Sequence, residues 1–158
     1  MNAFAPDGLL LIGIGNESRG DDGLGWRFLD VLRAKGLICE KAYRYQLQIE
    51  DAEFISSFQH VVFIDATREP LAAGFSFGSC EPADEFSFST HRQSPGVVLH
   101  LAQDLFQSKV KGYVLAIAGY EWALGQGLSK RGEANLERAI QFFTERFKAS
   151  REVALPIL

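Results

Sequence analysis

Two carboxylates and one imidazole occupy positions in this sequence where they could form a reactive site. Asp22 lies in a glycine-rich segment that follows an apolar run, Asp65 closes the apolar run HVVFIDA, and His91 follows a phenylalanine-rich stretch. One imidazole with two carboxylates leaves positions open on a divalent metal of the zinc or nickel kind, which suits a binding or catalytic site better than a closed structural one. If the three side chains meet, they predict an open metal site.

Each of these residues also has a simpler interpretation. An acid such as Asp22 in the first turn of a helix interacts favourably with the helix dipole by about 0.3 to 1 kcal/mol, without any ligand. A histidine such as His91, among Ser, Thr and Arg, is often a surface residue. Asp65 is harder to explain in this way, because a carboxylate at the end of a buried strand is costly unless it is paired or metal-bound.

The first half of the chain predicts a parallel α/β sheet. Residues 9–14 are continuously apolar, as in a strand buried on both faces, and the segment GIGNESRGDDGLG then leads into a helix that should end near Gly36. Alternation from Tyr43 to Leu47 indicates a half-exposed strand near a sheet edge. A short helix over about 49–57 and a third strand over 60–66 complete a βαβαβ pattern.

The strand order 2-1-3 would bring the first acid and the second acid together. In such a sheet the strands numbered one and three are neighbours, and the first and second helices leave the sheet on opposite faces, which opens a crevice at the carboxyl ends of the strands. Asp22 follows the first strand and Asp65 ends the third. We therefore expect both carboxylates on the rim of one crevice.

The second half of the chain should complete a mixed sheet. Too few residues separate positions 66 and 75 for a crossover helix, so a strand over 75–79 should run antiparallel, and a returning strand over 86–90 should deliver His91 to the same edge. Ser94 and Pro95 should begin a helix that carries three apolar residues inward. These three residues are Val98, Leu101 and Leu105.

The last part of the sequence predicts one further strand and one further helix. The strand covers 113–118, and the loop GYEWALGQG after it has the composition of a segment that holds a partner or forms a lid. Ser129 should cap the final helix. Its buried face should consist of Leu136, Ile140, Phe143 and Phe147.

Composition limits the possible functions. The 158 residues, 47% hydrophobic and 23% charged, predict a single domain over residues 1–158 with one core. A net charge of −4 without a basic stripe argues against nucleic acid as a partner. Cys39 and Cys80 lack metal-binding or redox spacing. Short apolar runs predict no membrane span, and the start of the sequence predicts no secretory signal, so we expect a cytoplasmic location.

The glycine-rich segment does not fit a nucleotide-binding motif. A GxGxxG fingerprint would need glycine where the chain has Ser18, and no GK[ST] ending of a P-loop is present. Two common peptidase motifs are also missing: the sequence has no HExxH and no cysteine beside a histidine. A nucleotide-binding α/β regulator stays as an alternative class, weakened by the missing glycine.

Four motifs together resemble a known family. The segment GIGNESRGDDGLGWRFLDVL, the strand-ending FIDA, the STH after a phenylalanine-rich stretch and the late GYEWALGQGLS are similar to the hydrogenase maturation proteases, the endopeptidases that trim the large subunit of nickel-iron hydrogenases. Their order and spacing fit from about Leu9 to the last helix. The resemblance implies a three-layer sandwich, phosphorylase/hydrolase-like, with a twisted and mostly parallel mixed sheet between helices.

The resemblance also implies a function for the three side chains. Asp22, Asp65 and His91 would recognise nickel, with zinc or cadmium able to substitute, and Asp22 and Asp65 would be catalytic. Many members of the family carry glutamate where this chain has Asp22. The substrate would be a large-subunit precursor already loaded with nickel, from which a C-terminal extension is cut. Either the carboxylates activate water, or a metal polarises the scissile carbonyl.

Other residues near these motifs have weaker roles. Glu17, Arg19 and Asp21 share the first loop and could touch the precursor, although solvation at the surface is the expected role of each. Arg92, beside His91, could hold carboxylates of the precursor. A non-catalytic module that binds nickel or a hydrogenase subunit is the second alternative class.

Overall fold

The computed structural model describes residues 8–84 and 93–154, with side chains described as far as position 147. The expected strand over 86–90 and the residues His91 and Arg92 lie outside the described residues. Within the described part of the chain, no helix is long and apolar enough to cross a membrane.

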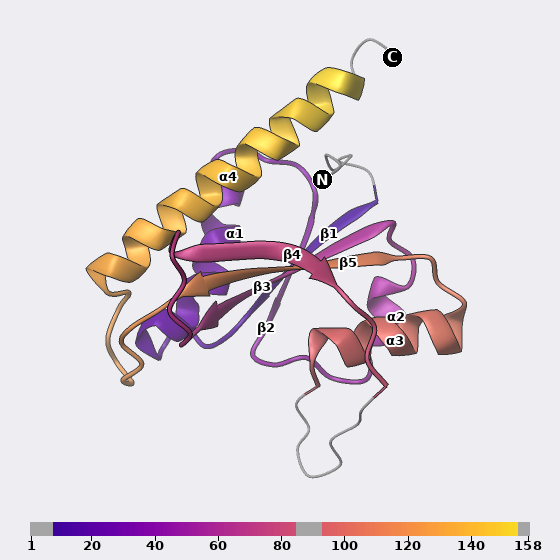
Figure 1. Cartoon of the computed structure of the whole chain (residues 1–158), viewed down its shortest axis with the longest axis horizontal. Coiled ribbons are helices and arrows are strands. Elements are labelled where there is room, and N and C mark those ends of the chain that lie inside the picture. Colours follow the sequence, from indigo (N-terminus) through magenta and orange to yellow (C-terminus); the bar gives the residue numbers. More distant parts are fainter. Residues whose placement is uncertain (1–7, 85–92, 155–158) are drawn as a thin grey trace.

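Within the described residues, five strands form one sheet, and this sheet is mixed, as the sequence predicted (Figure 1). The strand order is β2-β1-β3-β5-β4, and β4 is antiparallel to β5 while the other neighbours are parallel. The strands are β1 Leu9–Ile14, β2 Glu40–Arg44, β3 His60–Thr67, β4 Phe75–Cys80 and β5 Lys111–Ala118.

Helices cover both faces of the sheet, which gives the expected three layers. Helices α1 (Leu24–Ala34) and α4 (Lys130–Ala154) pack on one face, and α2 (Asp51–Ile55) and α3 (Pro95–Phe106) pack on the other (Figure 1). The side chains of β1 alternate between the two layers, because successive residues of a strand point to opposite faces. Leu9 and Leu11 join the α1/α4 core, and Leu10 and Ile12 join the α2/α3 core.

Local signals in the sequence place several helix ends. The Ser94 side chain accepts a hydrogen bond from the Val97 amide at 3.2 Å, and Pro95 opens α3. Gly36 follows α1 with a left-handed φ of 76°, a conformation that glycine adopts at low cost. The expected buried face of α4 is confirmed, because its four predicted residues are all buried.

Two expectations about exposure and strand bounds were wrong. Leu105 is 59% exposed rather than inward. The buried residues of α3 end at Ala102, so the last turn of the helix extends past the described core. The second strand covers Glu40–Arg44 and not Tyr43 to Leu47. It does lie at the sheet edge, but Leu47 is buried through an isolated bridge to Gln93 rather than through the strand.

The turn between β1 and α1 depends on very close backbone contacts. A Cβ on Gly25 would lie 2.5 Å from the carbonyl oxygen of Ile64, and one on Gly13 would lie 2.6 Å from that of Gly25. Gly15 has a φ of 137°, and a Cβ there would lie 2.0 Å from the carbonyl oxygen of Asp22. The glycine-rich segment thus packs α1 directly on the sheet and fixes the turn that carries Asp22.

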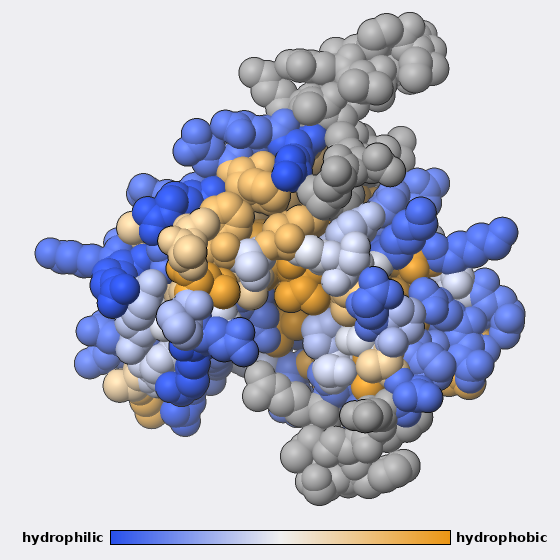
Figure 2. All heavy atoms as spheres, in the orientation of Figure 1, coloured by the Kyte–Doolittle hydropathy of each residue, from blue (hydrophilic) through white to orange (hydrophobic). Residues whose placement is uncertain are grey.

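Aromatic side chains join β4 to α4. The ring of Phe142 lies 5.2 Å from that of Phe75 and 5.5 Å from that of Phe77, measured between centroids. In the view of Figure 2, apolar residues gather along the middle of this face and hydrophilic residues cover its flanks. The antiparallel edge of the sheet is therefore held by α4.

Candidate functional site

A hollow of about 430 Å³ lies where β1 and β3 end, and both predicted acids line it. Besides Asp22 and Asp65, its wall includes two cations, a further acid and a tryptophan. The full lining is Arg19, Asp22, Asp65, Ala66, Thr67, Arg68, Glu69 and Trp122. The 2-1-3 topology therefore brings together two residues separated by more than forty positions, at the crevice that the sheet order predicted.

Asp22 belongs to a short 3-10 helix, η1 (Gly20–Gly23), at the end of the glycine-rich segment. Its carboxylate Oδ2 accepts a hydrogen bond from the Asn16 amide at 2.9 Å, and its own amide donates to the Arg19 carbonyl at 3.0 Å. The side chain is half-buried. One carboxylate oxygen is therefore held by the loop, which orients the group at the wall of the hollow.

Asp65 lies in the carboxyl-terminal part of β3, opposite Ala116 of β5. The strand continues for two residues to Thr67, so Asp65 is close to the strand end without being its last residue. It is half-buried, whereas the four residues before it are buried. Asp65 therefore stands where the buried strand opens onto the hollow.

The third member of the predicted site, His91, lies outside the described residues. Within residues 8–84 and 93–154, no three His, Cys, Asp or Glu side chains gather closely enough to hold a metal ion. Asp22 and Asp65 are the described donors of the predicted set. Two carboxylates suit nickel or zinc only with further ligands, so their roles as metal ligands and catalytic groups stay predictions.

Asp21 was expected at the surface, and that expectation was wrong. Its side chain is fully buried. The carboxylate accepts hydrogen bonds from the amides of Tyr120, Glu121 and Ser129 at 2.7, 3.1 and 2.8 Å, and from the Ser129 hydroxyl at 2.7 Å. The two adjacent acids therefore have different contacts: Asp22 faces the hollow, and Asp21 binds the loop after β5.

These hydrogen bonds lower the pKa of the Asp21 carboxyl group and so keep it ionised. Burial on its own raises the pKa of this carboxyl, but the donors from Tyr120, Ser129 and Glu121 outweigh it, and the pKa lies below its ordinary value. Asp21 is therefore ionised at neutral pH. Its charge is stabilised by the loop that it holds.

The loop between β5 and α4, residues 119–129, is attached to the first loop at further points. The Asp21 amide donates to the Glu121 carbonyl at 2.7 Å, the Gly20 amide to Gln126 at 3.1 Å, and the Gly125 amide to Ser18 at 2.8 Å. The loop places Trp122 on the wall of the hollow. Its aromatic and glycine-rich composition predicted a partner or lid segment but not this attachment through Asp21.

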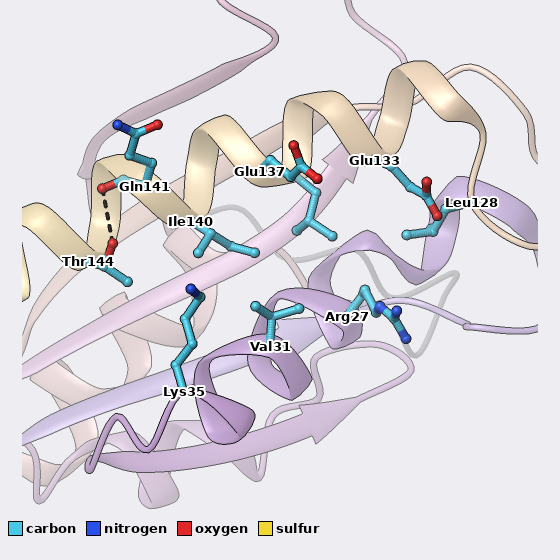
Figure 3. Close-up of a pocket in the computed structure, with 10 residues that line it drawn as sticks. Arg27, Val31, Lys35, Leu128, Glu133, Glu137, Ile140, Gln141 and Thr144 are labelled. Atoms are coloured by element: carbon cyan, nitrogen blue, oxygen red, sulfur yellow. Dashed lines mark hydrogen bonds between the residues drawn. The ribbon is translucent and has the colours of Figure 1, made fainter.

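A larger hollow, of about 600 Å³, lies between α1 and α4 and contains neither predicted acid (Figure 3). Arg27 of α1 and Lys35, which directly follows α1, line one side, and Glu133 and Glu137 of α4 line the other. Size alone would favour this groove. Its charged residues come from regular helix faces, however, whereas the smaller hollow has acids at the ends of strands, where sites in α/β sheets form.

Comparison with solved structures shows which proteins share this fold. The chain is similar to the nickel-iron hydrogenase maturation protease HycI from Thermococcus kodakarensis KOD1, with 20% identity and a TM-score of 0.66, covering 89% of this chain and 92% of that one. It is similar to the hydrogenase maturating endopeptidase HybD from E. coli, with 17% identity, a TM-score of 0.63 and coverage of 90% and 93%.

A third solved structure with the same fold is also a hydrogenase maturation peptidase. The hydrogenase 2 maturation peptidase from a Thaumarchaeota archaeon has 22% identity and a TM-score of 0.61, and the match covers 87% of this chain and 95% of that one. No protein-family description matches the sequence, and no curated protein matches it. At these identities the comparisons show that the chain has the α/β fold of hydrogenase maturation endopeptidases over almost its whole length.

Proposed function

We propose that this chain is an endopeptidase that removes the C-terminal extension of a nickel-loaded large-subunit precursor of a nickel-iron hydrogenase. The observation that carries the proposal is the pairing of Asp22 and Asp65 on one hollow at the carboxyl ends of β1 and β3. The shared fold supports it, because solved structures that are named hydrogenase maturation proteases align over nine-tenths of the chain.

Asp22 and Asp65 have the chemistry that peptide hydrolysis needs. A carboxylate that takes a proton from water lets the water oxygen bond to the scissile carbonyl carbon. When the carbon–nitrogen bond breaks, the second carboxyl group delivers a proton to the leaving amine. In the alternative route, Asp22, Asp65 and His91 would hold a metal, which would supply Lewis acidity at the scissile carbonyl. In the first route the two acids contact the reacting groups, and in the second they would hold the metal.

Nickel belongs to the substrate in this proposal. Asp22, Asp65 and His91 would recognise the nickel of the precursor, so a precursor without nickel would be cut poorly. Zinc or cadmium could occupy the same donors in vitro, because carboxylate and imidazole ligands suit these ions. We propose a cytoplasmic location, in which precursor and protease would meet without a membrane.

A mass-shift assay tests the proposal. Purified large-subunit precursor, with and without nickel, is incubated with the wild-type chain and analysed by intact-mass spectrometry. A loss of mass equal to the C-terminal extension, seen only with nickel, supports the endopeptidase. Binding of the nickel-loaded precursor without any mass change would instead support a non-catalytic module that binds nickel or the subunit.

A further inference from the structure

A stacked pair of side chains borders the hollow that contains the two acids. The guanidinium carbon of Arg68 lies 4.3 Å from the centroid of the Trp122 ring, and both residues line the hollow. They come from distant parts of the sequence: Arg68 follows β3 directly, and Trp122 lies in the loop before α4. The pair is therefore built by the fold at the site itself.

The backbone fixes the position of both partners. The Gly119 amide donates to the Thr67 carbonyl at 2.9 Å, which joins the end of β3 to the start of the Trp122 loop. A Cβ on Gly119 would lie 2.9 Å from Cη2 of Trp122, so the indole lies directly on this glycine. The loop is also held by the buried carboxylate of Asp21. These contacts thus fix the position of the Trp122 ring on which Arg68 stacks.

The stacked guanidinium still has donors to offer. Stacking occupies the flat face of an arginine and leaves its N–H groups, which lie in the plane, directed outward. Within the described residues, no hydrogen bond or ion pair engages the Arg68 side chain. A guanidinium in this arrangement can bind one carboxylate through two parallel hydrogen bonds.

Residues of both charge signs line the hollow. Asp22, Asp65 and Glu69 are acidic, and Arg19 and Arg68 are basic. A peptide carboxylate would be repelled by the acids and attracted by the arginines, of which Arg68 is the one held in place by stacking on Trp122. A peptide that places a carboxylate there has one point fixed relative to Asp22 and Asp65.

We propose that Arg68, stacked on Trp122, is a specificity-determining residue that binds a carboxylate of the peptide being cleaved and so sets the direction in which it crosses Asp22 and Asp65. This inference rests on the proposed endopeptidase function. The carboxylate comes either from an acidic side chain of the C-terminal extension or from its free C-terminus. Both share the chemistry that the guanidinium recognises.

Steady-state cleavage of nickel-loaded precursor by four proteins tests the subsite: wild type, Arg68→Gln, Arg68→Lys and Arg131→Gln. Arg131 is the matched control, because its guanidinium carbon lies 3.8 Å from the Tyr120 ring of the same loop but does not line the hollow. We expect Arg68→Gln to raise KM about tenfold or more with kcat within about twofold, as for loss of a charge-assisted pair. The KM of Arg68→Lys should lie between those of wild type and Arg68→Gln, and the KM of Arg131→Gln should equal that of wild type.

Salt dependence and inhibitor peptides test whether Arg68 binds a carboxylate and which carboxylate of the peptide it binds. The wild-type KM should rise with ionic strength more steeply than that of Arg68→Gln. A synthetic peptide of the extension should inhibit wild type, and inhibition should weaken either when its acidic side chains become amides or when its C-terminus is amidated, which distinguishes the two sources. Unaffected inhibition by both modified peptides would overturn the carboxylate assignment.

The failures of the two proposals are distinguishable. If wild type cleaves and Arg68→Gln has the wild-type KM, or if Arg131→Gln shifts KM equally, the subsite is wrong and the endopeptidase stands. If wild type leaves the nickel-loaded precursor uncut, the proposed function fails and the subsite fails with it.

Discussion

Ser129 donates both its amide and its hydroxyl to the buried carboxylate of Asp21, at 2.8 and 2.7 Å. The same hydroxyl oxygen accepts the Gly132 amide at 3.0 Å, as the N-cap of α4. One carboxylate therefore links the turn that carries Asp22 to the first turn of the last helix. The geometry of the candidate site and the position of α4 depend on each other through this contact.

Removal of the Asp21 charge should weaken both stability and activity. An Asp21→Asn change places an amide group where four donors converge, and we expect a loss of about 2 to 4 kcal/mol in the free energy of unfolding, measured by urea denaturation. It should also lower kcat on the precursor by shifting Asp22. Asp51→Asn is the matched control, because Asp51 is another buried acid, bonded to Arg44 and to the Gln48 amide. An equal loss of kcat in the control would contradict the positioning role.

Acid should destabilise the wild type through the same residue. The pKa of Asp21 is lowered in the folded chain from its ordinary 3.8, so the stability it contributes is present above about pH 4 and is lost as the pH falls through the folded-state pKa. The unfolding free energy of Asp21→Asn should therefore fall less steeply than that of wild type below pH 4. Parallel slopes in urea titrations across this range would contradict the assignment.

Gly15 should tolerate no side chain. A Gly15→Ala change puts a Cβ 2.0 Å from the Asp22 carbonyl oxygen, and we expect it to cost about 2 to 4 kcal/mol in unfolding free energy and to lower precursor cleavage. Gly36→Ala is the control: its φ of 76° is also left-handed, but nothing lies within 4 Å of an added Cβ. That variant should lose only about 1 to 2 kcal/mol and keep its activity. Equal effects would mean that the contact with Asp22 is unimportant.

Metal binding tests the predicted donor set. If Asp22, Asp65 and His91 hold a metal together, each single alanine variant should weaken zinc, cadmium or nickel binding in calorimetric titrations, by tenfold or more as an order of magnitude. His91→Ala should also reduce pull-down of the nickel-loaded precursor. Unchanged affinity in all three variants would exclude a shared site.

Local signals in the sequence were sufficient to predict most of the fold. The apolar run at Leu9, the short connection before β4 and the Ser94 cap each depend on rules that act over a few residues, and the structure confirms each of them. The predicted burial of Leu105 was wrong, because helical periodicity does not show where the surface that a helix packs against ends. The alternation from Tyr43 to Leu47 gave wrong bounds for the second strand, because β2 ends at Arg44 and the next residue, Tyr45, is exposed.

The candidate site could be predicted only in part. Asp22 and Asp65 could be placed on one crevice because strand order determines which strand ends meet. Asp21 could not be distinguished from its neighbour, because its partners Tyr120 and Ser129 lie about a hundred residues further along the chain. The same distance in sequence hid the stacking of Arg68 on Trp122.

The central claim is that the two acids on the hollow cut the peptide bond, and the Asp65→Asn variant tests it most directly. This change keeps the size of the side chain and one acceptor oxygen but removes its charge. Nickel-loaded precursor is incubated with wild type and with the variant, and both the mass shift and the amount of precursor pulled down are measured. We predict that the variant still binds the precursor while its cleavage rate falls at least about 100-fold. Cleavage by Asp65→Asn at the wild-type rate would contradict the account.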